Sequence, residues 1–201
     1  IFLMICKICK KNQCIEILNL GKQPLANKYP KTTKEIKNEK LYPLKLIFCE
    51  NCKLVFIKRI VNRKKLFEDY FYLSSVNKGL VRHFENLAQS LKKSKFVVDI
   101  GSNDGILLKP LKKLKINCLG VDPSKNVGKI ANDNNLETLI GFFDESIVSK
   151  ILKKYKKPDT VVASSIFTHL ENPILFVKNL KKLLHNRWNH LFLKLNIYPI
   201  L

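Results

Sequence analysis

The sequence predicts an α/β protein in which a small cysteine-stapled domain precedes a larger domain built on a parallel sheet. Two Cys-x-x-Cys pairs, Cys6–Cys9 and Cys49–Cys52, lie in the first third of the chain. From Lys95 onward, short apolar runs alternate with segments of helical periodicity. Apolar strands separated by helices are typical of a parallel sheet that is covered on both faces.

The length and composition are those of a folded protein with room for one ordinary domain and a small module. The chain has 201 residues, and 46% of them are hydrophobic, which is too many for a disordered chain. No apolar run approaches the roughly 20 residues that span a bilayer. The opening stretch from Ile1 to Ile5 is too short for a signal-peptide core. We therefore expect a cytoplasmic protein without a membrane anchor, where paired cysteines more often bind metal than form disulfides.

The strongly basic charge raises the question of nucleic-acid binding. The formal net charge is +21, and clustered basic residues neutralise phosphates. Nucleic-acid readers usually rely on arginine, but of the 37 basic residues only Arg59, Arg63, Arg82 and Arg187 are arginines. The lysines are spread from Lys7 to Lys194. We interpret the charge as solvated surface. The alternative is a basic face that serves an anionic substrate or nucleic acid.

The chain divides into three parts. We assign a metal-binding domain to residues 1–60, a connecting helical segment to 61–94 and a nucleotide-type binding domain to 95–201. The connecting segment carries apolar residues at helical spacing, namely Leu80, Phe84, Leu87 and Leu91.

Strands are expected in the first and third parts. Residues 20–24 are predicted to form a turn, and short strands are predicted at 44–48 and 54–60, around the second cysteine pair. The third part is predicted to contain strands at 96–100, 116–121, 138–140 and 159–164, and helices near 105–114, 125–133, 145–154 and 172–184.

The cysteine spacing points to a structural metal site. Each Cys-x-x-Cys turn offers two thiolates, and two such turns complete the tetrahedral ligand set of Zn²⁺. We therefore predict one zinc ion, and its ligands are Cys6, Cys9, Cys49 and Cys52. The alternative is that one or both pairs are redox-active or simply buried thiols. Cys14 and Cys118 are expected to be ordinary buried residues.

A strand-turn-helix pattern begins at Val97 and reads VVDIGSNDG. Gly101 and Gly105 permit close approach of a ligand to the backbone, and the next helix points its N-terminus at that ligand. At the end of the following strand, Asp122 can accept hydrogen bonds from both hydroxyls of a ribose. A dinucleotide fingerprint would read G-x-G-x-x-G, whereas this loop reads G-x-x-x-G. That difference favours S-adenosylmethionine, which has no pyrophosphate. The alternative is a connection without a ligand.

Further motifs accompany the two cysteine pairs in a fixed order. They are Leu20–Asn27 (LGKQPLAN), Tyr42–Leu44 (YPL), Cys49–Val55 (CENCKLV), Leu66–Ser75 (LFEDYFYLSS), Asp99–Leu108 (DIGSNDGILL), Gly120–Ser124 (GVDPS), Phe142-Phe143 and Ile166–Leu170 (IFTHL). From residue 4 to about residue 184 the chain resembles the zinc-containing sugar C-methyltransferases. These enzymes of deoxysugar biosynthesis use S-adenosylmethionine to methylate a carbon of a nucleotide-linked deoxy-keto-sugar. The resemblance implies a zinc-binding domain followed by a Rossmann-like class I methyltransferase domain, here incomplete.

The resemblance also implies roles for particular residues. The cofactor loop would comprise Asp99, Gly101, Ser102, Asn103 and Gly105, with Asp122 at the ribose, Phe142 or Phe143 near the adenine, and Ser164 and Ser165 beside the methyl donor. On the acceptor side, Tyr70 and Tyr72 would face the sugar and His169 would reach the same place. The alternative for the aromatic residues is plain packing. For His169 it is a capping or core role.

The reaction that the resemblance implies needs a base. A carbon is acidic only beside a carbonyl, so the acceptor must be a keto-sugar whose enolate attacks the methyl group. In the family, a His within a Tyr-His-Glu-His stretch is the expected base, and a C-terminal domain follows it. The chain ends at Leu201 before either, and His185 and His190 do not match that context.

We therefore expect a truncated or frameshifted member of the family that is nearly silent in catalysis. Trp188 stands where a turn before an apolar strand is expected, and a one-base shift near position 187 would restore both. Two alternatives stay open: a methyltransferase for another small molecule, and a zinc-module protein that binds nucleic acid. The sugar, the carbon, the pathway and the oligomeric state are left undetermined by the sequence.

Overall fold

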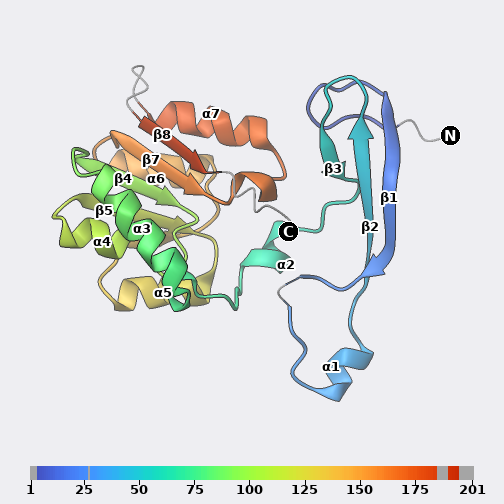
Figure 1. Ribbon diagram of the computed structural model, residues 1–201, viewed down its shortest axis with the longest axis horizontal. Helices are drawn as coiled ribbons and strands as arrows, with labels where there is room; N and C mark the ends of the chain where they lie inside the picture. The colour runs from blue at the N-terminus through green and yellow to red at the C-terminus, as the bar shows by residue number, and fades with distance from the viewer. Residues whose placement is uncertain (1–3, 27, 185–189, 195–201) are drawn as a thin grey trace. The chain divides into compact units, whose positions relative to one another are not determined.

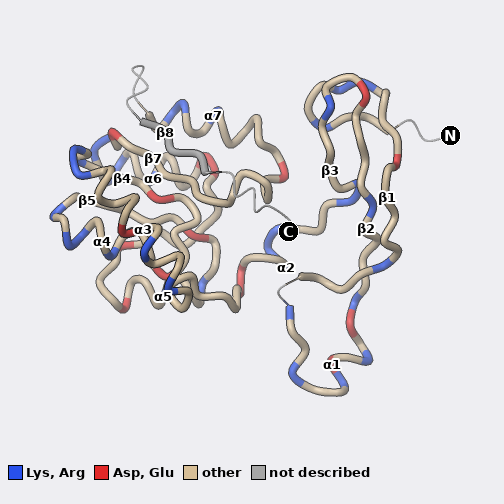
Figure 2. The backbone as a smooth tube through the Cα atoms, in the orientation of Figure 1, with Lys and Arg blue, Asp and Glu red and all other residues tan. Residues whose placement is uncertain are grey.

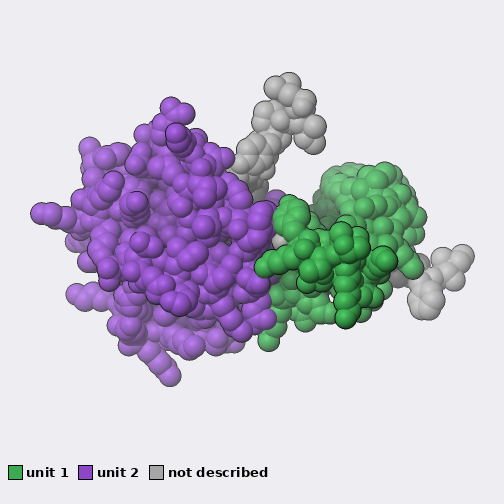
Figure 3. Space-filling model, turned by 90° about the horizontal axis from the view of Figure 1, so that it is seen from below, with its two compact units in different colours: residues 1–66 green, residues 67–201 purple. Residues whose placement is uncertain are grey.

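The computed structural model describes residues 4–26, 28–184 and 190–194, and it divides the chain into two compact units (Figure 1). The first is Ile1–Leu66 and the second is Phe67–Leu201, coloured separately in Figure 3. Within the described residues, no helix is both long and apolar enough to cross a membrane. Lysine and arginine residues occur along both units, as Figure 2 shows.

The first unit is a three-stranded antiparallel sheet in the order β1-β2-β3. Its strands are β1 (Cys14–Gln23), β2 (Tyr42–Cys49) and β3 (Val55–Ile57), with α1 (Thr33–Lys37) between β1 and β2 and α2 (Arg63–Phe67) after the sheet. The two strands predicted around the second cysteine pair are present. The predicted turn at 20–24 is wrong, because Lys22 and Gln23 still pair with β2. A register shift between Asn19 and Lys22, with Gly21 at φ 69°, lets the strand kink without leaving the sheet.

The two faces of this sheet differ in chemistry because side chains alternate along each strand. Ile47 and Cys49 of β2 point to one face and are fully buried. The other face carries two cross-strand rows of apolar residues, Ile15–Phe48–Val55 and Leu18–Leu46–Ile57. The side chains of those rows that belong to β1 and β3 are exposed. The unit is therefore organised around the cysteine-bearing face.

The second unit is a five-stranded parallel sheet in the order β6-β5-β4-β7-β8. Its strands are β4 (Phe96–Ile100), β5 (Asn117–Asp122), β6 (Thr138–Ile140), β7 (Thr160–Ser164) and β8 (His190–Lys194). The helices are α3 (Lys78–Ser90), α4 (Leu108–Lys113), α5 (Lys125–Asp133), α6 (Glu145–Lys154) and α7 (Pro173–Leu183), with 3₁₀ turns η1 (Ser74–Val76) and η2 (Phe167–His169). The parallel α/β fold predicted from the alternating pattern is confirmed.

The far end of the sheet differs from the expectation. β8 pairs in parallel with β7, from Thr160 opposite His190 to Ser164 opposite Lys194. A strand is thus present in the sequence as it stands, where the sequence analysis expected one only after a shift of frame. The positions on which that expectation depended, Arg187 and Trp188, lie outside the described residues, as does His185.

Two layers of helices bury the sheet. On one face, Val98, Leu119 and Val161 pack with α6 and α7. On the other, Val97 and Val162 pack with α3 and α4. Because all strands are parallel, the loops that follow β4, β5 and β7 meet at one edge of the sheet. Most residues of the predicted cofactor site lie on these loops or at the strand ends before them, whereas Phe142 and Phe143 follow β6.

Candidate functional site

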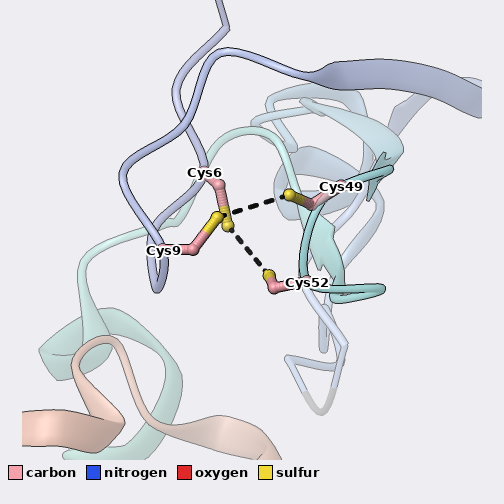
Figure 4. A group of neighbouring side chains, drawn as sticks. All are labelled: Cys6, Cys9, Cys49 and Cys52. Atoms are coloured by element: carbon pink, nitrogen blue, oxygen red, sulfur yellow. Dashed lines mark hydrogen bonds between the residues drawn. The ribbon is translucent and has the colours of Figure 1, made fainter.

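The four cysteines of the predicted zinc site lie together in the first unit (Figure 4). The Sγ atoms of Cys6 and Cys52 are 3.6 Å apart, as are those of Cys9 and Cys49. All four sulfurs lie within 4.8 Å of one another. A tetrahedral zinc ion with Zn–S bonds of about 2.3 Å separates its sulfurs by about 3.8 Å. The donor set and its spacing therefore fit zinc.

The two cysteine turns have the same backbone design. In the first, the N–H of Lys10 donates to Cys6 O at 3.2 Å; in the second, the N–H of Lys53 donates to Cys49 O at 2.8 Å. Both lysines have φ 62°, in the left-handed region. The residue after each lysine closes the turn, since Lys11 O and Leu54 O accept the N–H of the first cysteine of their own pair, each at 2.8 Å. The chain thus presents two equivalent metal-binding turns.

Backbone N–H groups favour thiolates at two of the four positions. The N–H of Lys11 is the main cause that lowers the pKa of Cys9 to about 6, and the N–H of Cys52 is the main cause that lowers the pKa of Cys49. At Cys52 the N–H of Leu54 lowers the pKa, but burial and the neighbouring thiols outweigh it and the pKa rises to about 12. Crowded thiols cannot all ionise without a cation, and zinc supplies one.

Cys14 and Cys118 are not members of the four-cysteine group. Cys14 lies opposite Cys49 in the β1–β2 ladder, yet it is not in the group that could hold a metal. Burial raises the pKa of Cys14 to about 11 and that of Cys118 to about 11. Both are half-buried. Each thiol therefore stays protonated at neutral pH.

In the second unit, the loop after β4 needs both of its glycines. Gly101 and Gly105 have φ 77° and 83°, which disfavour any residue with a Cβ. A Cβ on Gly101 would lie 2.4 Å from Ile166 Cγ2, and one on Gly105 would lie 2.5 Å from Leu136 Cδ1. Gly101 N–H also donates to Val121 O at 2.7 Å. The loop is thus packed closely against Ile166, which follows β7, and against Leu136, which precedes β6.

Asp122, at the end of β5, fixes the same loop. Its Oδ2 accepts the N–H of Asn103 at 2.8 Å, and its Oδ1 accepts the N–H of Ser124 at 2.9 Å. Burial raises the pKa of Asp122, although these two N–H groups oppose the rise. In this structure the carboxylate therefore holds the backbone of two loops, and a carboxylate has further lone pairs beyond these two.

Asp99 adds a second buried carboxyl group at the end of β4. Only 2% of the residue is exposed. Burial, and then the charge of Asp122, raise its pKa well above the usual range. Two desolvated carboxyl groups that repel each other are stabilised by a cation. S-adenosylmethionine carries a sulfonium and an ammonium group, so its charge fits this pair of residues.

Two other loop residues have unpaired oxygens. In the described part of the chain, Ser102 Oγ and Asp104 Oδ1 are buried without a hydrogen-bond partner. Ser102 Oγ faces Gly120, because a Cβ there would lie 2.5 Å from it. The other oxygen of Asp104, Oδ2, accepts the N–H of Ser75 at 3.1 Å. It also accepts a hydrogen bond from the hydroxyl group of Ser75. Asp104 received no role in the sequence analysis, although it lies inside the quoted glycine motif.

The predicted acceptor-side residues share an aromatic cluster. The ring of Phe67 lies 6.1 Å from that of Tyr70 and 5.8 Å from that of His169. Phe71 connects Tyr70 to Tyr72, because its ring lies 6.2 Å from that of Tyr70 and 6.3 Å from that of Tyr72. His169 is exposed as a residue, but its ring is partly desolvated, and burial lowers its pKa. The structure thus brings Tyr70 and His169 to the same aromatic residue.

The remaining predicted residues follow β6 and β7. Phe143 packs edge-on against Phe176, ring centroids 5.3 Å apart, and contacts the main core. This contact supports the packing interpretation for Phe143, although Phe142 and Phe143 are both half-buried. Ser164 ends β7, and Ser165 follows with φ 62°. Both serines lie at the sheet edge that carries the glycine loop.

One pair of contacts was not predicted from the sequence. Asn126, in the first turn of α5, accepts the N–H of Tyr70 at 3.1 Å and donates to Tyr70 O at 2.7 Å. No motif marks this residue, because an Asn near the start of a helix is commonplace. Only the fold brings it beside the segment that carries the tyrosines.

Comparison with known proteins agrees with the division of the structure into two units. A family model described as "Putative zinc binding domain" matches residues 6–67, and one described as "Methyltransferase domain" matches residues 72–194. The C-methyltransferase NovU of Streptomyces niveus is 25% identical over 171 residues, which is 82% of this chain and 41% of NovU. The chain thus spans about two fifths of that relative.

Two of the solved structures to which the chain is similar are described as methyltransferases. One is a SAM-dependent methyltransferase from Archaeoglobus fulgidus, with a TM-score of 0.45 and 18% identity, over 53% of this chain and 48% of that one. Another is the plantazolicin methyltransferase BamL in complex with a substrate analogue and SAH, with a TM-score of 0.42 and 22% identity, over 52% and 41%.

Proposed function

We propose that this chain serves C-methylation of a nucleotide-linked deoxy-keto-sugar. The chain belongs to the methyltransferase-domain family, and its cofactors are S-adenosylmethionine and zinc. The observation that carries this proposal is the similarity to the C-methyltransferase NovU over 82% of the chain, a length that takes in parts of both units. The order of a zinc-binding domain before a methyltransferase domain supports it.

The residues that would hold the cofactor follow β4 and β5. Bound S-adenosylmethionine supplies a methyl group on a positively charged sulfur. Gly101 and Gly105 would set the tight course of this loop around the cofactor, since both have a positive φ and neither has room for a side chain. Asp99 and Asp122 would face the positive charge and the ribose. Asp122 can do so while it still holds the loop, because a carboxylate has about four lone-pair sites.

On the acceptor side, the chain's own groups suit proton transfer beside a ketone. The lowered pKa of His169 keeps its imidazole neutral at pH 7, so that a ring nitrogen can accept a proton. The hydroxyl groups of Tyr70 and Tyr72 can donate hydrogen bonds to an enolate oxygen. We assign the positioning of the sugar to these tyrosines and make His169 the first candidate for the base.

Zinc has a structural role in this proposal. Its four cysteine ligands fill a tetrahedral coordination sphere, and the two turns that carry them bring the segment before β1 to the β2–β3 turn. Without the metal, the cysteine-bearing face of the sheet would lose the interaction that closes it. The metal would therefore stabilise the first unit rather than contact the acceptor.

Cofactor binding and turnover are tested separately. Isothermal titration with S-adenosylmethionine should show one site per chain. Mass spectrometry after incubation with nucleotide-linked 4-keto-6-deoxy sugars should show the gain of one methyl group, with deuterium wash-in at the carbon beside the ketone. Turnover by this chain would show that it contains the base, with His169 the first candidate to test.

The possible failures point to different conclusions. Cofactor binding without wash-in would place the base outside this chain. Methylation of another small molecule, with every keto-sugar ignored, would overturn the acceptor class. Salt-sensitive retention on DNA or RNA, with no cofactor binding, would favour the nucleic-acid alternative.

A further inference from the structure

A short segment of the second unit is attached to the predicted cofactor loops by side chains rather than by a sheet. This segment, residues 68–76, carries Tyr70 and Tyr72 and ends in the η1 turn; we call it the strap. It forms no β-strand. Its backbone polar groups therefore need partners elsewhere. Several of those partners are side chains on the loops that follow β4 and β5.

Asn126 binds the strap in the way that a neighbouring strand would. Its side-chain amide accepts the N–H of Tyr70 at 3.1 Å and donates to the C=O of the same residue at 2.7 Å. The adjacent Lys125 N–H donates to Glu68 O at 3.0 Å. These contacts come from the first turn of α5, directly after the Asp122–Ser124 turn. The start of this helix is thus joined to the strap at two points.

Asn103 binds the next part of the strap. Its Nδ2 donates to Tyr72 O at 3.1 Å, and its Oδ1 accepts the N–H of Ser74 at 2.8 Å. Its own backbone N–H donates to the carboxylate of Asp122. Asn103 has φ 51°, a conformation that Asn tolerates better than most residues. The same residue thus belongs to the cofactor loop by its backbone and to the strap by its side chain.

We propose that Asn103, Asp104 and Asn126 are positioning residues that couple the strap to the cofactor loop, an inference that rests on the proposed function. Asp104 completes the set through its bonds to Ser75. A cofactor that orders the loop and the start of α5 fixes the three side chains on which the strap depends. The strap then loses less freedom when an acceptor binds. Occupied protein should therefore present Tyr70 and Tyr72 to the acceptor in one arrangement, and empty protein should not.

The test is amide hydrogen exchange of the strap with and without S-adenosylhomocysteine, a cofactor form that has no methyl group to transfer. The reporters are the N–H groups of Tyr70, Ser74 and Ser75, whose acceptors are these side chains. In the wild-type chain, saturating S-adenosylhomocysteine should slow their exchange by about tenfold or more, as expected when local opening becomes harder.

Two variants remove the coupling with little change to the backbone. Asn103→Gly keeps the positive φ but removes the amide, and Asn126→Ala removes both bonds to Tyr70. Each should speed strap exchange by about tenfold, because a hydrogen bond is lost. Each should also abolish most of the slowing by S-adenosylhomocysteine. The matched control is Asn134→Ala at the end of the same helix, where the amide bonds only its own helix at Ile130 O.

The outcomes separate this proposal from the function on which it rests. Strap protection by S-adenosylhomocysteine that is lost in both variants and kept in the control supports coupling, even if no keto-sugar is methylated. Binding of S-adenosylhomocysteine with unchanged strap exchange overturns coupling and leaves the cofactor assignment intact. No binding by folded wild-type chain overturns both. Variants that retain full protection would also overturn the roles of Asn103 and Asn126, and unaltered thermal unfolding would show that both had folded.

Discussion

The carboxylate of Asp122 accepts the backbone N–H of Asn103 at 2.8 Å, so the end of β5 fixes the loop that follows β4. The two residues are 19 positions apart in the chain. The same carboxylate accepts the N–H of Ser124 and thereby shapes the start of α5. One acidic side chain therefore organises two loops at the sheet edge, and its substitution should destabilise both.

Replacement of Asp122 by Ala should weaken both folding and cofactor binding. Two buried N–H groups lose their acceptor, which costs roughly 1–3 kcal/mol in the free energy of unfolding. We expect S-adenosylhomocysteine affinity, measured by isothermal titration, to fall by about tenfold or more. Asp122→Asn is the matched variant, since it retains one acceptor oxygen and should recover part of the stability. Equal affinity in all three proteins would remove Asp122 from the cofactor site.

Replacement of Gly101 by Ala should destabilise the second unit and abolish cofactor binding. The added Cβ meets Ile166 Cγ2 at 2.4 Å, and φ 77° is itself unfavourable for Ala. A second substitution, Ile166→Ala, should relieve the clash but not the backbone strain. Gly21→Ala is the control for strain alone, because its φ is 69° and its Cβ would meet no atom within 4 Å. If Gly101→Ala unfolds no earlier than Gly21→Ala, the contact with Ile166 is unimportant.

Replacement of Asp99 by Asn should stabilise the empty protein above about pH 4 and weaken cofactor binding. The folded-state pKa is raised by burial and by Asp122, above an unfolded value of about 3.9. The folded protein therefore holds a proton that the unfolded chain has lost, and wild-type stability declines as pH rises from about 4 through the folded pKa. Asn carries no such penalty. Thermal unfolding at several pH values measures the difference, and a wild-type pH slope that persists in the variant would contradict it.

The surface carboxylate Asp133 provides the control for that experiment. It forms an exposed ion pair with Lys129 within α5. Pairs of this kind contribute little, on the order of 0–1 kcal/mol. Asp133→Asn should therefore leave both the pH slope and the affinity for S-adenosylhomocysteine unchanged.

Zinc content should depend on the four cysteines of the metal site but not on Cys14. We expect about one zinc per chain by elemental analysis, and its loss in Cys49→Ser. Cys14→Ser should retain the metal, although Cys14 is the cross-strand partner of Cys49, because its raised pKa keeps it a thiol. Zinc-free, folded protein with four unpaired thiols would contradict the assignment. Removal of zinc by a chelator should unfold the first unit.

Proton abstraction, if this chain performs it, should fail at acidic pH. Burial lowers the pKa of His169 below its ordinary value of about 6.5, so the neutral base persists to lower pH and is lost as pH falls through that lowered pKa. Deuterium wash-in on a keto-sugar measures the profile. His169→Gln should abolish wash-in and, with it, the decline of wash-in at acidic pH. His83→Gln on α3 should leave the wash-in rate and its pH profile unchanged. Wash-in that survives in His169→Gln would assign the base to another group.

The second unit was predictable because its signals are local. Runs such as Phe96–Ile100 are apolar except for Asp99. The helices α5 and α6 have helical periodicity and matched the expected ranges, 125–133 and 145–154. The first unit was harder. β1 runs through Gly21 by means of a register shift, which sequence patterns do not distinguish from a turn. The metal replaces much of its core, so that few long apolar runs mark its strands.

The candidate site was predictable only in part, for a similar reason. The Cys-x-x-Cys spacing that begins at Cys6 and at Cys49 indicates a metal site, and Gly101 indicates a turn. The partners of the strap carry none, since Asn126 and Asp104 act through contacts across 56 and 29 positions. Such contacts depend on the topology of the sheet and not on local pattern.

The position of the four cysteines along the chain has a consequence for how the protein is made. All of them have left the ribosome soon after Cys52, but β4 cannot complete its pairing until β7 arrives, from Thr160 onward. Those positions are 108 residues apart (160 − 52), which takes on the order of ten seconds to synthesise. During that interval the first unit can already capture zinc. Scarcity of the metal would therefore affect the nascent chain, whose otherwise buried Ile47 would be open to chaperones, before any methyltransferase fold exists.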